Sequence, residues 1–549
     1  MLRILIQLFI LLEIITACNS SESELLKWES YDETAELRAN ANHLISRMQY
    51  KRIQSQHTDR NYLFIPFHED LINFTKEDHD KLKPLILEQD ILSLQQSISE
   101  GKLSYETLTL FYIYRIYTYE LNRDTYLNAL IALNPEVLKE ARAKDRYRAM
   151  QLNHPLYGMP ILLKDNINAL PMATTAGAAA FKENVPKADA FIVSQLKKNG
   201  ALILGKVNLS EWAYYFCQGC PLGYSAIGGQ TLNPYGRMQF ETGGSSSGSG
   251  VAVAANYAVA ALGSETSGSI LSPSGKNSVV GLKPTIGALS RSGIVPISSS
   301  LDTAGPMTKN VLDNAILMSV FSEKDPTDVF SYESKAVRYK GLDTVRLKGK
   351  RLGLIRRFEE DSLMQLVIQK MEAEGAEIII FNPPKIELKA FRTILDVDMK
   401  RDLPKYIDQY ANISLAFDSI KDILNFNRKD TLLHAPYGQA IFERIVQDTT
   451  SMEYFEPIKI KIMEDAKAYF KNSIEEYNLD AVLSIDNYSA SYAAAAHYPA
   501  LGVPMGYKSN GQPQNITFIA PSKHEQQLLE IGAAFERIIK ARKIPEGYK

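Results

Sequence analysis

The stretch "ETGGSSSGSGVAVAANYAVAALGSETSGSILSPSG", residues 241–275, decides how this chain is interpreted. It places one Gly/Ser segment before a run of small apolar residues and a second one after it. A flexible Gly/Ser linker lacks such apolar content. The run at 251–262 is also too short to cross a membrane, which takes about 20 residues. We therefore predict a buried helix at 251–262, packed closely against a sheet, with a loop at each end.

The two loops do not match a nucleotide-binding site. The pattern G-x-x-x-x-G-K-[ST] is absent from them. A G-x-G-x-x-G register that starts at Gly248 has Val253 in place of its third glycine. Since these glycines allow the backbone to approach a phosphate group, the stretch does not predict phosphate binding.

Nucleophilic chemistry is the remaining interpretation, and one form of it uses Ser246. Residues 244–248 match G-x-S-x-G, the nucleophile turn of α/β-hydrolases, with Ser246 at its centre. Such an enzyme needs a downstream histidine as its base, and nothing marks His434, His497 or His524 as one. His497, in "AAAAHYPA", has the apolar neighbours of a packing residue. A Ser-His-Asp esterase or lipase therefore stays only as an alternative.

Strand and helix patterns alternate around this stretch. "GMPILLKDNI" (158–167) and "ALILGKVNL" (201–209) have the composition of buried strands. "AFIVSQLKKNG" (190–200) and "KHEQQLLEIGAAFERIIKA" (523–541) have the periodicity of helices. This alternation predicts an α/β protein whose mixed sheet is flanked by α-helices on both faces.

Composition and charge exclude some partner classes. The 549 residues are 45% hydrophobic and 23% charged, which is typical of a globular protein. Lys and Arg number 61 against 63 Asp and Glu, and no basic stripe carries interleaved aromatic residues. We therefore expect no nucleic-acid partner. The acidic segment "FHEDLINFTKEDHD" lacks the ligand spacing of a metal site and is predicted to be a solvated face.

The N-terminus, "MLRILIQLFILLEIITACNS", has the features of an export signal. An early cation, Arg3, precedes an apolar run that is shorter than a membrane span and ends in small residues before Cys18. The end of this run resembles the bacterial lipobox, in which the cysteine is lipidated. We expect an exported, membrane-anchored bacterial lipoprotein on the periplasmic or cell-surface side. An ordinary cleaved signal and an uncleaved anchor are the alternatives.

The expected organisation follows from this. Residues 1–18 form the lipoprotein signal peptide, residues 19–88 an N-terminal extension and residues 89–545 the main domain, in which 311–480 carries no recognisable motif. Cys217 and Cys220 form "CQGC", which predicts either a local disulfide or two packed thiols in an exported protein. A single such pair cannot supply the four ligands of a structural zinc site.

Lys164 ends the apolar strand "GMPILLK", where a lysine either extends to water or faces a polar site. At this point the chain resembles the amidase signature family, and within it the secreted peptide amidases. The resemblance covers residues 92–313 and resumes at 481–537. The motifs that carry it are "GMPILLKDNI", "GALILGKVNLSEWA", "GGQTLNPYG", "GGSSSGSGVAVAA", "ALGSETSGSI", "GLKPTIGALSRSGIVPISSSLDTAGPM" and "FIAPSKHEQQLLEIGAAFE".

The resemblance implies the amidase signature fold and a Ser–cisSer–Lys triad. Matched residue by residue, Lys164 is the base, Ser245 the relay serine that follows a cis peptide bond, and Ser269 the nucleophile. The supporting glycines of the relay loop are Gly243 and Gly244. The residues of the implied oxyanion hole and substrate contact are Thr266, Ser267, Gly268 and Ser269.

This triad requires a neutral lysine. A lysine becomes a base at neutral pH only if burial lowers its pKa from about 10.4. Asp165 follows Lys164 directly, but neighbouring side chains of a strand point to opposite faces, so we expect the two not to pair. The opening stretch is then two halves of one site, with the relay loop before the apolar run and the nucleophile loop after it.

The implied activity is hydrolysis of carboxylic amides to acid and ammonia. C-terminal peptide amides are the first substrate class, with simple aliphatic or aryl amides as the alternative. The resemblance implies no metal and no organic cofactor, and leaves the oligomeric state open. The family's transamidation subunits act on charged transfer RNA in the cytoplasm, a role against which the export signal argues. A substrate-binding lipoprotein with a decayed site is a third alternative, although all three triad residues are present.

The sequence departs from the family pattern at a few positions. Ser267 stands where many members have glycine, and Leu271 where many have arginine. Ile227 replaces an arginine common in peptide amidases, and "GQPQNITFI" replaces a more glycine-rich pattern. These departures leave the triad intact and concern the choice of substrate, as does the region 311–480, which shapes the substrate pocket in this family.

Overall fold

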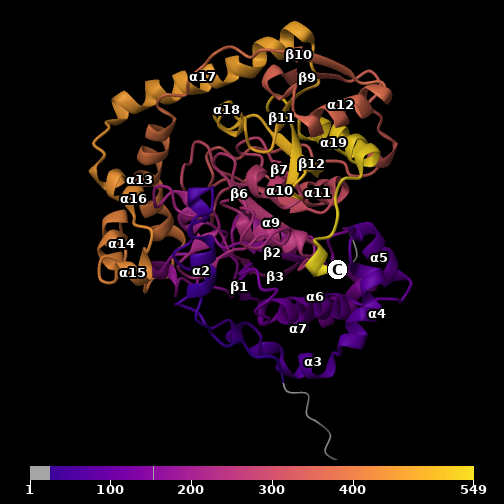
Figure 1. Ribbon diagram of the computed structural model, residues 1–549, viewed down its shortest axis with the longest axis vertical. Coiled ribbons are helices and arrows are strands. Elements are labelled where there is room, and N and C mark those ends of the chain that lie inside the picture. The colour runs from indigo at the N-terminus through magenta and orange to yellow at the C-terminus, as the bar shows by residue number, and fades with distance from the viewer. Residues whose placement is uncertain (1–24, 152–153) are drawn as a thin grey trace, which may run out of the picture.

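A computed structural model describes residues 25–151 and 154–549, and within them one large mixed sheet runs through the molecule (Figure 1). Cys18 and the rest of the predicted signal peptide lie outside the described residues. In their order across the 11-stranded sheet, the strands are β1 (Leu130–Leu133), β3 (Leu202–Val207), β2 (Pro160–Lys164), β6 (Ala260–Glu265), β8 (Thr303–Thr308), β7 (Val280–Lys283), β12 (Ala500–Tyr507), β13 (Pro513–Ile519), β11 (Ala481–Ile485), β9 (Arg351–Ile355) and β10 (Glu377–Phe381).

The sheet is parallel in two places and antiparallel elsewhere. Strand β2 pairs in parallel with both β3 and β6, and β9 pairs in parallel with β11 and β10. The strands between them, from β6 through β8, β7, β12 and β13 to β11, are antiparallel. Strand β2 is therefore flanked by strands on both sides, and all five of its residues are buried. A separate two-stranded pair consists of β4 (Tyr224–Ser225) and β5 (Gly229–Gln230).

Helices cover both faces of the sheet, as strand β12 shows. A methyl group placed on Gly532 of α19 (Glu525–Ile539) would meet Leu501 and Val503, whereas one placed on Gly502 would meet Leu271 of α10 (Leu271–Lys276). Because alternate residues of a strand face opposite ways, α19 and α10 lie on opposite faces. The predicted α/β class, with a mixed sheet between helices, is confirmed.

Most of the remaining helices form three groups (Figure 1). The first group, at the end of the molecule that holds β1, is α2 (Thr34–Asn40), α3 (His68–Asn73), α4 (Lys76–Ile86), α5 (Ile91–Ser99), α6 (Tyr105–Glu120) and α7 (Val137–Gln151). The central group is α8 (Phe191–Lys198), α9 (Ser247–Ala254) and α11 (Val311–Met318). The third group is α13 (Phe391–Tyr410), α14 (Ile420–Asn427), α15 (Thr431–His434), α16 (Ala440–Gln447), α17 (Met452–Tyr477) and α18 (Ala490–Ala495). Helix α12 (Ser362–Ala373) lies apart from them and packs on α19, β12 and β10.

Two apolar clusters hold these layers together. The larger one contains the sheet and reaches into the N-terminal helices, where Phe64, Phe67 and Ile86 are buried. The smaller one joins α13, α14 and α16 to the loop before β4, and within it the rings of Trp212 and Phe442 lie 5.4 Å apart. Helices α13, α14 and α16 thus pack on a loop that follows β3. Nowhere in the described residues does a helix combine the length and apolar character needed to cross a bilayer.

The predicted helix at 251–262 is correct only in its first part. Helix α9 ends at Ala254, Asn256 turns the chain at a φ of 57°, and Ala260 already begins the buried strand β6. Both halves are buried on all sides, so neither shows a polar face. A uniformly apolar run of this kind does not distinguish helix from strand by its periodicity.

Candidate active site

Lys164 is the last residue of β2, and its side chain is completely buried. Its amine lies 2.7 Å from Ser245 Oγ, 2.9 Å from Ser264 Oγ and 3.0 Å from the carbonyl oxygen of Ser264. Burial lowers the pKa of Lys164 to about 7, although the negative charges of Asp302 and Glu265 act in the opposite direction. A large fraction of these amines is therefore neutral at neutral pH.

Asp165 does not pair with Lys164, as expected. Its carboxylate lies 2.9 Å from the amine of Lys206 on the neighbouring strand β3, and both side chains are completely buried. The backbone N–H of Thr175 also donates to Asp165, and the Lys206 amine donates to Thr174 Oγ1. The carboxylate nearest to Lys164 in sequence thus has its own cation on the other side of the strand.

The relay loop approaches its neighbours so closely that only glycine fits before Ser245. Gly243 has a φ of 66°, and a Cβ there would lie 2.7 Å from the backbone of Ser272 and Pro273. A Cβ on Gly244 would lie 2.6 Å from Ser210 Oγ. The peptide bond from Gly244 to Ser245 is cis, as the family resemblance implies.

Hydrogen bonds join the relay loop to the segment after β3 and to the nucleophile loop. The carbonyl of Ser245 accepts from the N–H of Ser210 at 3.0 Å. The N–H of Ser246 donates to the carbonyl of Ser269 at 3.1 Å. The two halves of the opening stretch, far apart along the chain, therefore meet at Ser269.

The nucleophile loop runs from Thr266 to Ser269, between β6 and α10. Glu265 fixes its far end, because its carboxylate accepts from the N–H groups of Ile270 at 2.7 Å and Leu271 at 3.0 Å. Ser269 is 8% exposed, so of the three predicted triad residues it is the one that a ligand can reach, whereas Lys164 and Ser245 are fully buried.

The backbone of this loop offers hydrogen-bond donors to a ligand. Within the part of the chain that the structure describes, no hydrogen bond uses the backbone N–H of Ser267, Gly268 or Ser269 as its donor. Gly268 has a φ of 84°, a conformation that favours glycine. Free N–H groups beside a serine hydroxyl are the arrangement that stabilises an oxyanion during acyl transfer.

Ser246, the alternative nucleophile, faces the interior. Its hydroxyl donates to the carbonyl of Ser264 at 3.0 Å, and the residue is fully buried. His497 is partly buried, and burial lowers its pKa to about 4, in keeping with its predicted packing role. The geometry thus brings together Lys164, Ser245 and the Ser269 loop, and it keeps Ser246 out of reach of a substrate.

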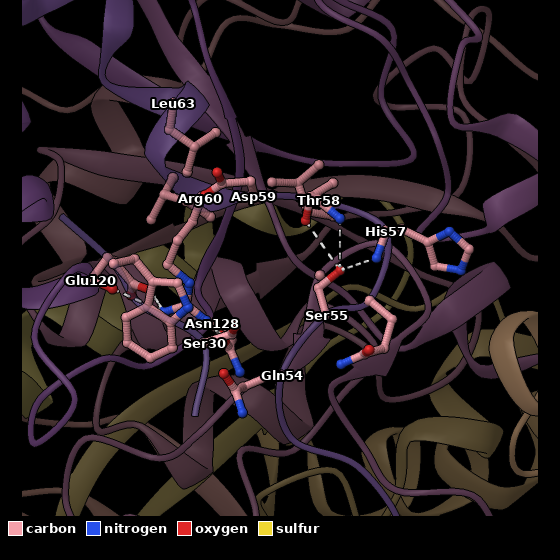
Figure 2. A pocket seen from close by; sticks show the side chains of 15 residues that line it. Ser30, Gln54, Ser55, His57, Thr58, Asp59, Arg60, Leu63, Glu120 and Asn128 are labelled. Carbon is pink, nitrogen blue, oxygen red and sulfur yellow. Dashed lines mark hydrogen bonds and ion pairs between the residues drawn. The ribbon is translucent and has the colours of Figure 1, made fainter. Parts of the chain in front are cut away.

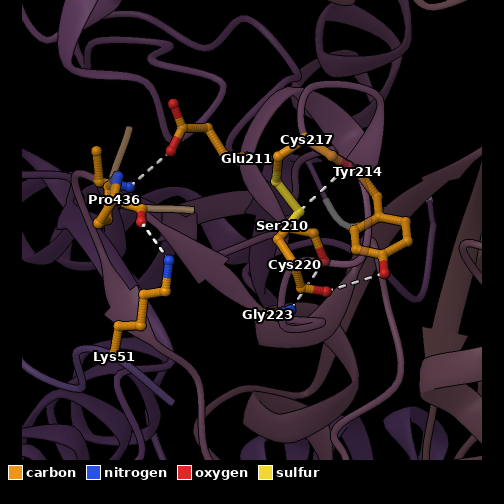
Figure 3. Close-up of a disulfide and its surroundings, with 9 residues drawn as sticks. Lys51, Ser210, Glu211, Tyr214, Cys217, Cys220, Gly223 and Pro436 are labelled. Carbon is orange, nitrogen blue, oxygen red and sulfur yellow. Dashed lines mark hydrogen bonds between the residues drawn. A yellow bond between two sulfur atoms is a disulfide. The ribbon is translucent and has the colours of Figure 1, made fainter. Parts of the chain in front are cut away.

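Cys217 and Cys220 form a disulfide, so the first of the two predicted alternatives is correct (Figure 3). The disulfide closes the end of the segment that begins at Ser210. Tyr214 donates from its hydroxyl to the carbonyl of Cys220 at 2.9 Å, and the N–H of Gly223 donates to Ser210 Oγ at 2.8 Å. These contacts hold Ser210, which in turn holds Ser245.

Three residues of the site were not assigned from the sequence: Asn166, Ser264 and Asp302. Asn166 Nδ2 donates to Ser264 Oγ at 2.9 Å, and Asp302 accepts from Thr266 Oγ1. Asp302 lies in the motif "SSSLDTAGPM", so the sequence contained a signal for it. Ser264 lies within an apolar strand, where nothing in the pattern marks its side chain as facing Lys164.

A separate polar cavity of about 440 Å³ opens between β1 and the segment 54–60 (Figure 2). Arg60 crosses it, donates to the carbonyl of Glu120 at 2.9 Å and to Asn128 Oδ1, and stacks on Trp28. None of the three triad residues lines this cavity. The cavity is therefore separate from the site around Lys164.

Comparison with known proteins identifies the family. The sequence model of the family described as Amidase matches residues 108–484. The chain belongs to the amidase family. It is 35% identical over 481 residues to a "Probable amidase" of Arabidopsis thaliana, covering 84% of this chain and 92% of that protein. It is 30% identical to a glutamyl-tRNA(Gln) amidotransferase subunit of Caldanaerobacter subterraneus, covering 81% of this chain and 96% of that protein.

Solved structures of amidases share the fold. An amidase family protein from Bacillus anthracis has a TM-score of 0.85 and 35% identity, covering 90% of this chain and all of that one. The peptide amidase of Stenotrophomonas maltophilia has a TM-score of 0.78 and 36% identity, covering 84% and 99%. The predicted family and the amidase signature fold are thus confirmed, and this amidase is an enzyme that hydrolyses amides.

The buried pair beside Lys164 gives a first prediction. Lys206→Met leaves the carboxylate of Asp165 buried without its cation, which costs about 3–5 kcal/mol of unfolding free energy. The double variant Lys206→Met/Asp165→Asn removes both charges and should regain much of this loss. Denaturant unfolding of the three proteins measures the difference. Equal stability of the single variant and the wild type would contradict the prediction.

Proposed function

We propose that this amidase is an exported, lipid-anchored hydrolase that converts carboxylic amides to acid and ammonia through an acyl-enzyme on Ser269. C-terminal peptide amides are its proposed substrate class. The observation that carries the proposal is the buried amine of Lys164, 2.7 Å from Ser245 Oγ and with a pKa of about 7. A base of this kind suits a serine nucleophile, which is weak until its proton is removed.

The proposed proton path runs from Ser269 through Ser245 to Lys164. A neutral amine has two hydrogens and one lone pair. If its hydrogens point to the carbonyl and hydroxyl oxygens of Ser264, the lone pair faces Ser245 Oγ and can accept its proton. Ser245 then takes the proton of Ser269 as Ser269 Oγ bonds to the amide carbon. The free N–H groups of the loop at 267–269 would stabilise the oxyanion that forms.

Collapse of this intermediate breaks the C–N bond. The proton returns from Lys164 through Ser245 to the leaving nitrogen, which departs as ammonia and leaves an ester on Ser269. A water molecule, deprotonated along the same path, attacks the ester carbon, and the acid leaves as Ser269 regains its proton. The cycle consumes one amide and one water, and releases one acid and one ammonia.

Similarity to a peptide amidase supports the substrate class, and the predicted export signal argues against a role on transfer RNA. A solved structure named as a peptide amidase matches 84% of this chain. The amidotransferase subunits found among the relatives are named for charged transfer RNA. Simple aliphatic or aryl amides remain the alternative substrates to include in any test.

Replacement of Ser269 tests the nucleophile. In a soluble form that starts after Cys18, ammonia release from amidated peptides and simple amides is measured for wild type, Ser269→Ala and Ser246→Ala. We expect Ser269→Ala to lower kcat by at least about 1,000-fold, because the variant lacks the hydroxyl that attacks the amide carbon. Ser246→Ala removes one internal hydrogen bond and should keep far more activity. Full turnover by Ser269→Ala would rule out this mechanism.

The pH dependence tests the base. Lys164 acts only when neutral, and its pKa lies at about 7. The value of kcat/KM should therefore rise about tenfold per pH unit below pH 7 and level off above it. The measurement is kcat/KM on one amide between pH 5 and pH 9.5. A rise that continues to the upper end would indicate an ordinary lysine pKa and contradict the proposal.

The anchor is tested with the full-length protein in a bacterial host. Metabolic labelling with palmitate should mark the wild type, since Cys18 would carry the lipid, and should leave Cys18→Ser unlabelled. Cys217→Ser/Cys220→Ser, which keeps Cys18, is the matched control and should stay labelled. An unlabelled wild type would refute the lipid anchor and leave the amidase activity untouched.

A further inference from the structure

A single carboxylate, that of Asp302, joins the nucleophile loop to the turn at 297–302. One of its oxygens accepts from Thr266 Oγ1. The other accepts from the N–H groups of Ile297 at 2.8 Å and Ser298 at 2.9 Å. Asp302, Thr266 and Ser264 also line one cavity of about 10 Å³, so the carboxylate lies beside the residues that surround Lys164. The position of Thr266 therefore depends on this turn.

Helix α13 holds the opposite side of the same turn. Asp398, which is fully buried, accepts from Ser298 Oγ and from the N–H of Ser300. The N–H of Ser299 donates to Asp402 at 2.9 Å. These are backbone and hydroxyl contacts along one helix face, so the turn is fixed between α13 and Thr266.

The charge of Asp302 also reaches Lys164. The acidic groups whose charges act on the Lys164 amine are Asp302 and Glu265, and both raise its pKa against the effect of burial. Burial raises the pKa of Asp302 itself to about 6, while its hydrogen bonds and the nearby Arg291 act in the opposite direction. Asp302 is therefore mostly ionised at pH 7 and above.

We propose that Asp302 is a positioning residue of the reaction, which holds Thr266 and the oxyanion-binding loop in place and connects that loop to helix α13. This inference rests on the proposed function of the loop. Asp302 touches no reacting atom in it. Its hydrogen bond fixes where the N–H groups of 267–269 point, and its charge sets how readily Lys164 gives up a proton. Helix α13, which belongs to the motif-free region 311–480, thereby supports the rate of the chemical step.

The hydrogen bond and the charge can be tested separately. Thr266→Val replaces the hydroxyl by a methyl group of similar size and keeps the backbone N–H and the charge of Asp302. Asp302→Asn removes the charge, while its amide oxygen can still accept from the N–H groups of Ile297 and Ser298 and its NH₂ can donate to Thr266 Oγ1. Thr75→Val is the matched control, because Thr75 Oγ1 donates to Asp78 at the start of α4, far from the site.

We expect Thr266→Val to change the rate and Asp302→Asn to change the pH dependence. Thr266→Val should lower kcat by about 10- to 100-fold with KM within about twofold, since displaced oxyanion donors cost less than the 10²–10³ of a missing one. Its pH profile should keep the midpoint of the wild type. Asp302→Asn should move the acidic limb of kcat/KM to lower pH by at least about half a unit, because an opposite charge near Lys164 is lost. Thr75→Val should match the wild type.

A second readout does not depend on knowing the substrate. The rate at which a fluorophosphonate labels Ser269 reports the reactivity of the hydroxyl and the oxyanion-binding groups. Labelling of Thr266→Val should be at least about tenfold slower than that of the wild type. Asp398→Asn, one step further away on α13, should slow it as well but by less. Thermal unfolding of each variant shows that the folded protein is being compared.

The outcomes separate the two proposals. One outcome is that the wild type is labelled, and that Thr266→Val is labelled and hydrolyses amides at the same rates as the wild type. This outcome refutes the positioning role of Asp302 and leaves the proposed function standing. An Asp302→Asn profile that superimposes on the wild type refutes the part of the inference that concerns charge. If the wild type is neither labelled nor active on any amide, the proposed function fails, and the positioning role fails with it.

Discussion

Burial of the Lys164 amine at the end of β2 is the constraint on which the rest of the site depends. Strands on both sides of β2 exclude water, so the ammonium form loses its hydration and the pKa falls to about 7. Among the residues that the structure describes, the hydrogen-bond partners of this amine are oxygens of Ser245 and Ser264, so proton transfer is expected to pass toward the relay loop.

The carboxylates of Asp165, Glu265 and Asp302 each have hydrogen-bond partners other than Lys164. Asp165 pairs with Lys206, and Glu265 accepts from two N–H groups at the start of α10. Asp302 accepts from Thr266 and from the turn at 297–302. A carboxylate that paired directly with Lys164 would keep the amine protonated, as opposite charges at contact distance do. The hydrogen bonds around the site therefore have two effects. They hold the loops in place, and they keep these carboxylates from pairing with the Lys164 amine.

The sequence predicted the parts of the site that lie in local motifs. These parts are the glycines before Ser245, the strand that ends at Lys164 and the loop around Ser269. Their residue types are unusual for a linker or an ordinary buried strand, so they can be recognised in the sequence. Ser264 and the division of 251–262 into a helix and a strand were missed. Both belong to uniformly buried segments, where side-chain direction depends on which strands become neighbours. The pairing of Asp165 with Lys206 likewise depends on β2 and β3 lying side by side, 41 residues apart along the chain.

Relatives named as peptide amidases and as transfer RNA amidotransferase subunits share this chain's fold or sequence, so the sheet and its loops do not by themselves select a substrate. We expect selection to involve the helices α13 to α16, which lie in the region where the sequence carries no recognisable motif. This group of helices packs on the segment around Trp212 and on the turn at 297–302. Ser210 of the first segment contacts Ser245, and Asp302 of the turn contacts Thr266. A substitution in α13 that changes which amide fits will therefore also displace the turn that supports Thr266. We expect specificity and turnover in this enzyme to change together, because the same helix contributes to both.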